Sequence, residues 1–298
     1  MGDWIKRVAL KVAQRSHFVT DVAVHIASSP HVQRHVKDSY PYLRERFIAN
    51  GREHRVDSAA RSDLVARFER IDASVPMGSS PTDGLFLAEM LLNVEAEGAL
   101  VECGCFAGGS TSKLSLVASL LGRRLFVFDS FEGLPVVEQQ YLRDQHCRRS
   151  DEWVTDWTSG RYAGRIDEVQ GNIRKFGDFG VCSFTKGWFS ETLTHDNLPH
   201  EVAFAFADVD LANSARDCFT ALWPVLTNGG IYVTHDTAYI KVLQEIYNPE
   251  LWLNQFKATP PMLFGAGFGL CNDSPHLGYM VKGDALSPEY LKRLTIDK

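Results

Sequence analysis

Long apolar runs are missing from this sequence. No stretch approaches the roughly 18 consecutive apolar residues of a membrane-spanning helix. No block of Lys and Arg is long enough to make a basic face, and the formal net charge is −6, so a nucleic-acid partner is not indicated. The N-terminus has no signal-peptide pattern, and the six cysteines include no C-x-x-C pair. We therefore expect a cytoplasmic protein with buried free thiols that binds neither membranes nor nucleic acids.

The 298 residues are enough for one large α/β domain or two small ones, and 45% of them are apolar. We expect an N-terminal helical arm and cap over residues 1–84 and the main domain over residues 85–298. Residues 1–40 place apolar side chains at helical spacing among basic ones, and a helix on a membrane surface is one interpretation. The interpretation that we favour is an arm packed on the domain or on a second subunit, which predicts a homo-oligomer.

The next segments predict two helices and then a sheet. Residues 61–71 follow the 3.6-residue period with Ser62 or Asp63 as N-cap, and residues 85–95 form a helix after the VPMGSSPTDG break. Five short apolar runs then alternate with helical stretches: 99–103, 124–128, 181–185, 202–207 and 230–234. Most lack polar alternation, as do strands buried on both faces of a parallel sheet. The pattern predicts an α/β fold with a doubly wound, mostly parallel sheet, closed by an antiparallel hairpin from runs near 262–270 and 277–281.

Residues 136–165 interrupt this alternation. The segment is polar and carries two tryptophans, Trp153 and Trp157. Long irregular insertions in compact domains tend to be functional or disordered. Because this one follows the end of a strand, we predict a lid.

The strongest ligand-binding signal is VECGCFAGGST at residues 101–111, between a strand and a helix. Its glycines let the backbone approach a ligand, at the sheet edge where open α/β folds bind them, and Ser110 or Thr111 can cap the helix. A phosphate-binding loop is a poor fit because Ser110 replaces the required lysine, and a dinucleotide motif fails because Phe106 replaces its second glycine. S-adenosylmethionine remains, and a purely structural turn is the alternative.

The second strand ends on Asp129, within RLFVFDSFEGLP. A carboxylate at this position can accept hydrogen bonds from both hydroxyls of a ribose. The alternative is a helix N-cap by Asp129 or Ser130, which leaves the FDSFEGLP run unexplained. Together with the glycine loop, Asp129 favours a nucleoside ligand.

Four more polar residues follow the fourth and fifth predicted strands. Asp208 and Asp210 end the fourth strand, and His235 and Asp236 end the fifth. The carboxyl ends of parallel strands lie at one edge of the sheet, so three carboxylates and an imidazole should meet beside the glycine loop. Any one of them could be structural, for instance Asp208 as a helix N-cap. As a set they indicate a catalytic site.

Four segments resemble the macrocin O-methyltransferase family, which includes sugar O-methyltransferases of macrolide and aminocoumarin antibiotic pathways. They are VECGCFAGGS, FVFDSFEGLP, FTKGWFSETL and FADVDLANSARDCFTALWPVLTNGGIYVTHD, in the family's order, over about half the chain. The resemblance implies a class I methyltransferase (Rossmann-like) fold and S-adenosylmethionine as methyl donor. It implies that Glu102, Gly104 and Ser110 face the methionine end of the donor. Asp129 and Ser130 would hold the ribose, and Gly187 and Trp188 would lie near the adenine.

The resemblance also implies Mg²⁺ or another divalent ion held by Asp208 and Asp236, with Asp210 as the general base that removes the hydroxyl proton. His235 departs from the family, in which an Asp-Asp pair is common. Imidazole is a poor ligand for Mg²⁺ and suits Mn²⁺, Fe²⁺ or Zn²⁺ better. His235 could instead act as a base, since an imidazole pKa lies near neutrality. Metal-assisted catalysis and metal-free His/Asp catalysis therefore both stay open.

Three hypotheses about function follow. The first is methylation of a hydroxyl on a small molecule, such as a sugar in a natural-product pathway. The second is O- or N-methylation of a flat acceptor such as a phenol or catechol, which aromatic residues would suit: Trp153, Trp157, Phe264 and Phe268. The third is a cofactor-binding protein without catalysis, against which the intact Asp208, Asp210 and Asp236 argue.

Overall fold

The apolar runs of the sequence form one sheet. The computed structural model describes residues 40–136 and 158–283, and in them six strands pair in the order β3-β2-β1-β4-β5-β6. The strands are β1 (Ala99–Cys103), β2 (Leu125–Asp129), β3 (Cys182–Lys186), β4 (Val202–Ala207), β5 (Leu226–Thr234) and β6 (Gly278–Val281). The first five are parallel and β6 runs antiparallel to β5. The predicted α/β fold with a doubly wound, mostly parallel sheet is confirmed.

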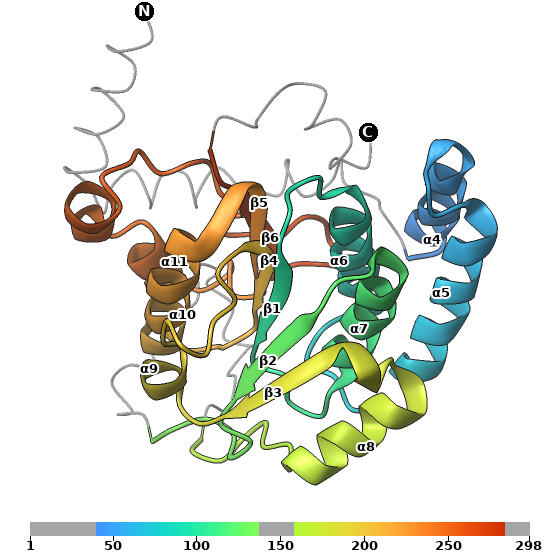
Figure 1. The fold of residues 1–298 in the computed structure, drawn as a ribbon, viewed down its shortest axis with the longest axis horizontal. Coiled ribbons are helices and arrows are strands. Elements are labelled where there is room, and N and C mark those ends of the chain that lie inside the picture. Colours follow the sequence, from blue (N-terminus) through green and yellow to red (C-terminus); the bar gives the residue numbers. More distant parts are fainter. Residues whose placement is uncertain (1–39, 137–157, 284–298) are drawn as a thin grey trace, which may run out of the picture.

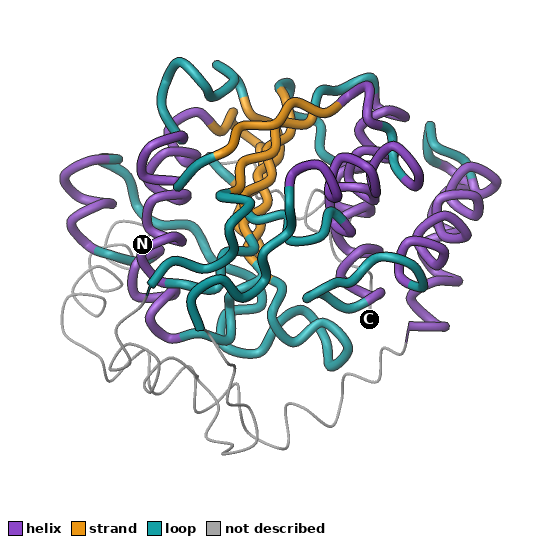
Figure 2. Tube along the Cα trace, turned by 90° about the horizontal axis from the view of Figure 1, so that it is seen from below, coloured by secondary structure: helices purple, strands orange, loops and turns teal. Residues whose placement is uncertain are grey.

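Helices cover both faces of the sheet (Figure 1, Figure 2). One face carries α4 (Tyr40–Ala49), α5 (Ser58–Asp72), α6 (Pro81–Asn93), α7 (Gly109–Leu121) and α8 (Ile166–Phe176). The other carries α9 (Phe189–Thr192), α10 (Ala212–Val225) and α11 (Ile240–Ile246). Short helical turns lie at η1 (Asn50–Glu53), η3 (Phe179–Val181) and η4 (Leu251–Gln255). Each face thus has its own apolar core against the sheet.

Two helices begin earlier than the sequence pattern suggests. The N-cap of α5 is Asp57, which accepts a hydrogen bond from the Ala60 N–H at 2.9 Å, so the predicted caps Ser62 and Asp63 are wrong. The N-cap of α6 is Ser80. Proline is favoured in the first helical turn, where its missing N–H costs no hydrogen bond, so Pro81 starts this helix instead of breaking it.

The C-terminal part of the sheet matches the prediction only in part. Strand β6 pairs with β5 as expected, whereas residues 262–270 contribute a single bridge, between Phe264 and Tyr279. Gly265, Gly267 and Gly269 have positive φ angles, which turn the backbone away from a continuous strand.

Several predictions fall on residues outside the described ranges. These are the N-terminal arm over residues 1–39, most of the proposed lid (137–157) with both of its tryptophans, and Cys147. The division at residue 84 stays a prediction, although α4, α5 and α6 pack into the same apolar core as α7. Within the described ranges, no helix combines the length and the apolar character needed to cross a membrane.

Candidate active site

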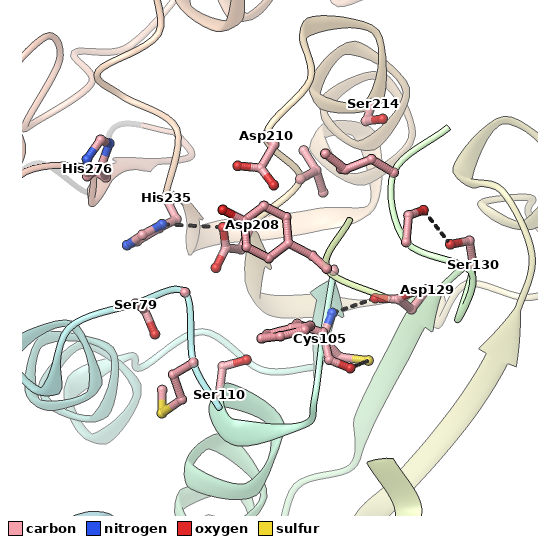
Figure 3. A pocket seen from close by; sticks show the side chains of 18 of the residues that line it. Ser79, Cys105, Ser110, Asp129, Ser130, Asp208, Asp210, Ser214, His235 and His276 are labelled. Atoms are coloured by element: carbon pink, nitrogen blue, oxygen red, sulfur yellow. Dashed lines mark hydrogen bonds and ion pairs between the residues drawn. The ribbon is translucent and has the colours of Figure 1, made fainter. Parts of the chain in front are cut away.

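The carboxyl ends of the parallel strands open into a cavity of about 300 Å³ (Figure 3). The backbone hydrogen bonds of the sheet continue past the strand ends: the Asp208 N–H donates to the Cys103 carbonyl and the His235 N–H to the Ala207 carbonyl, each at 2.9 Å. The residues after β1, β4 and β5 therefore leave the sheet at one level. All predicted site residues except Glu102 and Asp236 line this cavity: Gly104, Ser110, Asp129, Ser130, Gly187, Trp188, Asp208, Asp210 and His235.

Gly104 allows the loop after β1 to pass directly against the end of β4. Its φ angle is +85°, and a Cβ atom at this position would lie 2.0 Å from the Asp208 carbonyl oxygen. Any larger residue would push the two strand ends apart. The glycine therefore has a specific structural reason, and it leaves the loop backbone open to a ligand in the cavity.

Helix α7 begins behind this loop without a side-chain cap. Its N-cap is Gly108, so the predicted caps Ser110 and Thr111 are wrong. The Ser110 hydroxyl instead donates a hydrogen bond of 2.6 Å to Glu102 Oε1. Burial raises the pKa of Glu102 to about 8, against the hydrogen bonds of Ser110 and Thr111 that lower it. Glu102 is thus mostly protonated at neutral pH. It does not line the cavity itself, but its hydrogen-bond partner Ser110 does.

Two backbone N–H groups hold the Asp129 carboxylate at the cavity. Cys105 donates to Oδ2 and Phe131 to Oδ1, each at 2.7 Å. Each oxygen keeps a lone pair for a ligand hydroxyl. Ser130 closes the turn, since its hydroxyl donates to the Gly133 carbonyl at 3.0 Å. No described helix begins here, so the helix-cap alternative for Asp129 and Ser130 is wrong.

The loop after β3 supplies the flat wall of the cavity. Gly187 and Trp188 both line it, next to Phe189 from the start of α9. Lys186 faces solvent and pairs with Glu132 at 3.2 Å. A half-buried indole beside a glycine is a suitable surface for a planar base.

Asp210 has a left-handed backbone conformation, which sets it apart from Asp208 and Asp236. Its φ angle is +59°, and the Leu211 N–H donates to the Val209 carbonyl across it at 2.6 Å. A left-handed conformation costs a non-glycine residue about 1–3 kcal/mol and persists where the surrounding structure imposes it. The turn places the Asp210 carboxylate in the cavity close to Asp208 (Figure 3). Helix α10 has Leu211 as its N-cap, so Asp208 is not a helix cap.

His235 lies between two carboxylates. Its Nδ1 is 3.3 Å from Asp208 Oδ1, and its Nε2 is 3.2 Å from Asp83 Oδ2. Burial lowers the pKa of His235, but the charges of Asp208 and Asp83 outweigh burial and raise this pKa well above its usual value. With both ring nitrogens facing carboxylates, the protonated form of His235 is favoured, which does not suit the predicted role of a base.

Asp83 and Ser274 complete this array, and sequence patterns did not indicate either of them. Asp83 belongs to the first turn of α6, where it forms a capping box with Ser80, and the Ser274 hydroxyl donates to its Oδ1. Burial raises the pKa of Asp83, but the His235 cation and the hydrogen bonds of Ser274 and Ser80 lower it below the usual value. The capping box was a readable signal for the helix, yet nothing in the sequence links α6 to β5.

Asp236 lies behind the wall of the cavity. It is 1% exposed, is absent from the cavity lining, and accepts a hydrogen bond from the Val209 N–H at 3.1 Å through Oδ2. Burial, with the Asp210 and Asp208 charges, raises the pKa of Asp236 well above its usual value. Asp236 supports the turn that presents Asp210.

This arrangement does not fit the divalent ion that the resemblance implies. One oxygen of Asp208 faces His235, both nitrogens of His235 face carboxylates, and Asp236 is absent from the cavity lining. Within residues 40–136 and 158–283, no group of three or more His, Cys, Asp or Glu side chains is placed to hold a metal ion.

Of the four aromatic residues that the sequence suggested for the acceptor, the structure describes Phe264 and Phe268, and the cavity is lined by others. Phe264 stacks on Tyr279, and neither it nor Phe268 reaches the cavity. The lining aromatic side chains come from four loops and helix ends: Phe106, Tyr162, the adjacent pair Trp188 and Phe189, and Tyr239. The segment from Pro76 to Ser79, before α6, also contributes, although it read only as a break between helices.

Comparison with known proteins places this geometry in a family. The family model described as Macrocin-O-methyltransferase (TylF) matches residues 86–257, more than half of the chain. The chain belongs to the macrocin-O-methyltransferase family. The matched region runs from α6 past α11, so it includes the glycine loop, Asp129 and the residues after β4 and β5. Family membership supports S-adenosylmethionine as the methyl donor.

Two relatives of the chain come from Streptomyces species. The chain is 31% identical over 172 residues to 8-demethyl-8-(2,3-dimethoxy-alpha-L-rhamnosyl)-tetracenomycin-C 4'-O-methyltransferase of Streptomyces olivaceus, a match that covers 56% of this chain and 63% of that protein. It is 30% identical over 157 residues to demethyldecarbamoylnovobiocin O-methyltransferase of Streptomyces niveus, covering 50% and 56%. The matches thus span less than two thirds of either relative.

The fold agrees with a solved O-methyltransferase structure. The structure of the O-methyltransferase NovP superposes with a TM-score of 0.52 at 21% identity and covers 82% of this chain and 99% of its own. At this identity the likeness shows the fold alone, and it is the class I methyltransferase fold expected from the sequence.

Proposed function

We propose that this chain transfers a methyl group from S-adenosylmethionine to a hydroxyl of a small molecule, with the sugar units of natural products as the acceptor class. The observation that carries the proposal is the single cavity that joins the Gly104 turn and Asp129 to Asp210. The names of the two relatives, both natural-product O-methyltransferases, support the acceptor class.

The donor would lie along the ends of β1, β2 and β3. The backbone at Gly104 is accessible beside the Ser110 hydroxyl, and the Asp129 carboxylate points into the cavity with both oxygens fixed. These groups would bind the methionine end and the ribose, with Gly187 and Trp188 at the adenine. When bound, S-adenosylmethionine supplies a methyl group on a positively charged sulfur.

The acceptor hydroxyl would lie beside Asp210, the carboxylate that the left-handed turn holds in the cavity. The hydroxyl proton passes to Asp210 as the new C–O bond forms. The C–S bond breaks with its electron pair left on sulfur. Asp208 and His235 orient the acceptor from the neighbouring strand ends, because in-line transfer depends mainly on alignment.

Calorimetric titration of the purified chain with S-adenosylhomocysteine tests the donor site. We expect saturable binding that Asp129→Asn weakens, while Asp196→Asn, a change at a side chain that is 98% exposed, leaves it unchanged. Absence of binding would contradict the proposed donor. Transfer of a labelled methyl group to a panel of glycosylated natural products, nucleotide sugars and simple catechols then tests the acceptor class.

A flat phenol or catechol acceptor is the second candidate, favoured by the aromatic lining of the cavity, with Tyr162 and Tyr239 among its residues. Labelled product with catechols alone would favour this candidate over sugars. The homo-oligomer stays a prediction, because the arm that suggested it lies outside the described residues.

A further inference from the structure

His235 joins three elements that are distant in the sequence. It follows β5, its Nδ1 contacts Asp208 after β4, and its Nε2 contacts Asp83 in the first turn of α6. Asp83 is buried and also accepts hydrogen bonds from the hydroxyls of Ser274 and Ser80. The His235 ring is therefore held from both sides, and on the Asp83 side its partner is buried from solvent.

This array competes with a metal ion for its ligands. A ring nitrogen of His235 could coordinate an ion only by giving up its contact with Asp208 or with Asp83. Asp83 is buried, and leaving a buried carboxylate without a polar partner is costly. Asp208 Oδ1 is also occupied by the ring, at 3.3 Å from Nδ1.

The second implied ligand is no better placed. Asp236 is buried behind the cavity wall and accepts a backbone hydrogen bond from Val209. An ion beside the acceptor would have to lie in the cavity, where Asp208 and Asp210 are the lining carboxylates at this end. Octahedral ions such as Mg²⁺ need several well-placed oxygens, and this end of the site offers few.

We propose that methyl transfer in this chain is independent of a divalent metal ion, because the Asp83–His235–Asp208 array takes the place of the ion. The proposal rests on the methyltransferase function proposed above. His235 sets a fixed ring nitrogen beside Asp208, where Mg²⁺ would need oxygen ligands. It holds the Asp208 carboxylate in one orientation toward the acceptor, which is the positioning that an ion would otherwise provide.

Titration with Mn²⁺ tests this proposal on the full chain after treatment with a chelator. Mn²⁺ is the demanding probe because it accepts both carboxylate and imidazole ligands. Bound ion is measured by the loss of the free Mn²⁺ resonance, with and without saturating S-adenosylhomocysteine. Calorimetric titration with S-adenosylhomocysteine on the same samples reports on the donor site separately.

The informative variant is His235→Asp, which restores an acidic pair after β5. Because this change sets a new carboxylate against buried Asp83, the double variant Asp83→Asn/His235→Asp is made in parallel to remove that repulsion. His195→Asp is the matched control, since its side chain is 81% exposed and its neighbour is the exposed Asp196.

We expect no stoichiometric Mn²⁺ binding by the wild-type chain or by His195→Asp, and a gain of stoichiometric binding in His235→Asp or in the double variant. Stoichiometric binding by the wild-type chain that Asp208→Asn abolishes would overturn the proposal. Absence of binding in every variant would overturn the role given to His235. Loss of S-adenosylhomocysteine binding throughout would instead count against the proposed function.

Discussion

Replacing Asp210 with Asn separates catalysis from folding and from donor binding. The residue is held at a φ angle of +59°. Asn tolerates this left-handed region about as well as Asp does, so the turn after β4 should survive. The substitution keeps the size and shape of the side chain and removes its ability to accept a proton.

The expected loss follows from that missing proton acceptor. A positioned general base contributes about 100- to 10,000-fold to a rate. We therefore expect kcat to fall by that factor, which corresponds to about 2.7–5.4 kcal/mol of transition-state stabilisation. The affinity for S-adenosylhomocysteine should stay close to wild type, because the groups assigned to the donor follow β1, β2 and β3 instead of β4.

The assay is transfer of a labelled methyl group to whichever acceptor the panel identifies, combined with calorimetry and thermal melting. Asp196→Asn is the control, since it makes the same chemical change at a 98% exposed side chain. A fall in kcat of less than about tenfold, with the fold intact, would refute Asp210 as the base. A large loss of donor affinity would show that Asp210 acts on the donor instead.

Three further predictions follow from the site and its support. Asp129→Asn should weaken S-adenosylhomocysteine binding about 10-fold or more with kcat at saturation less affected, since a charge-assisted hydrogen bond contributes about 1.5–3 kcal/mol; unchanged calorimetric affinity would remove Asp129 from the donor site. Glu89→Gln should lower the free energy of unfolding in urea by about 3–5 kcal/mol, because it leaves the buried Arg61 guanidinium without its ion pair; a change below about 1 kcal/mol would show that Arg61 is compensated by its backbone partners. The raised pKa of His235 means that the folded chain holds a proton that the unfolded chain releases above its ordinary pKa of about 6.5. The stabilisation by His235 should be complete below that pH and decline as the pH rises toward its folded-state pKa. The melting temperature should therefore fall from pH 7 to pH 9 more in the wild-type chain than in His235→Gln. An equal fall of the melting temperature in both chains would contradict the ion pairs.

The local patterns of the sequence were sufficient for the sheet and for most of the cavity lining. Strands buried on both faces must be apolar throughout, so β1 to β5 stand out between helices. The bounds of β1 to β4 lie within one residue of the prediction, whereas β5 begins four residues earlier, at Leu226. Polar residues directly after such strands must gather at one edge because the strands are parallel. This is why Gly104, Asp129, Asp208 and His235 could be placed at one site before the tertiary structure was known.

Helix starts were less predictable. Capping depends on which nearby side chain reaches a free N–H group, and several candidates stood within one turn of each other. Asp57 rather than Ser62 caps α5, and Gly108 caps α7 with its backbone alone. Ser110 was then left to bond with Glu102.

The sequence by itself determined the order of strands and helices along the chain, the edge where ligands bind and most of the predicted residues that line the cavity there. Tertiary structure alone decided what those residues do to one another. Asp83 lies 152 positions from His235, and no periodicity or motif relates a helix cap to a residue after β5. Their contact exists because α6 packs beside the sheet with its first turn at the ligand edge, and that contact engages His235 as the partner of two carboxylates.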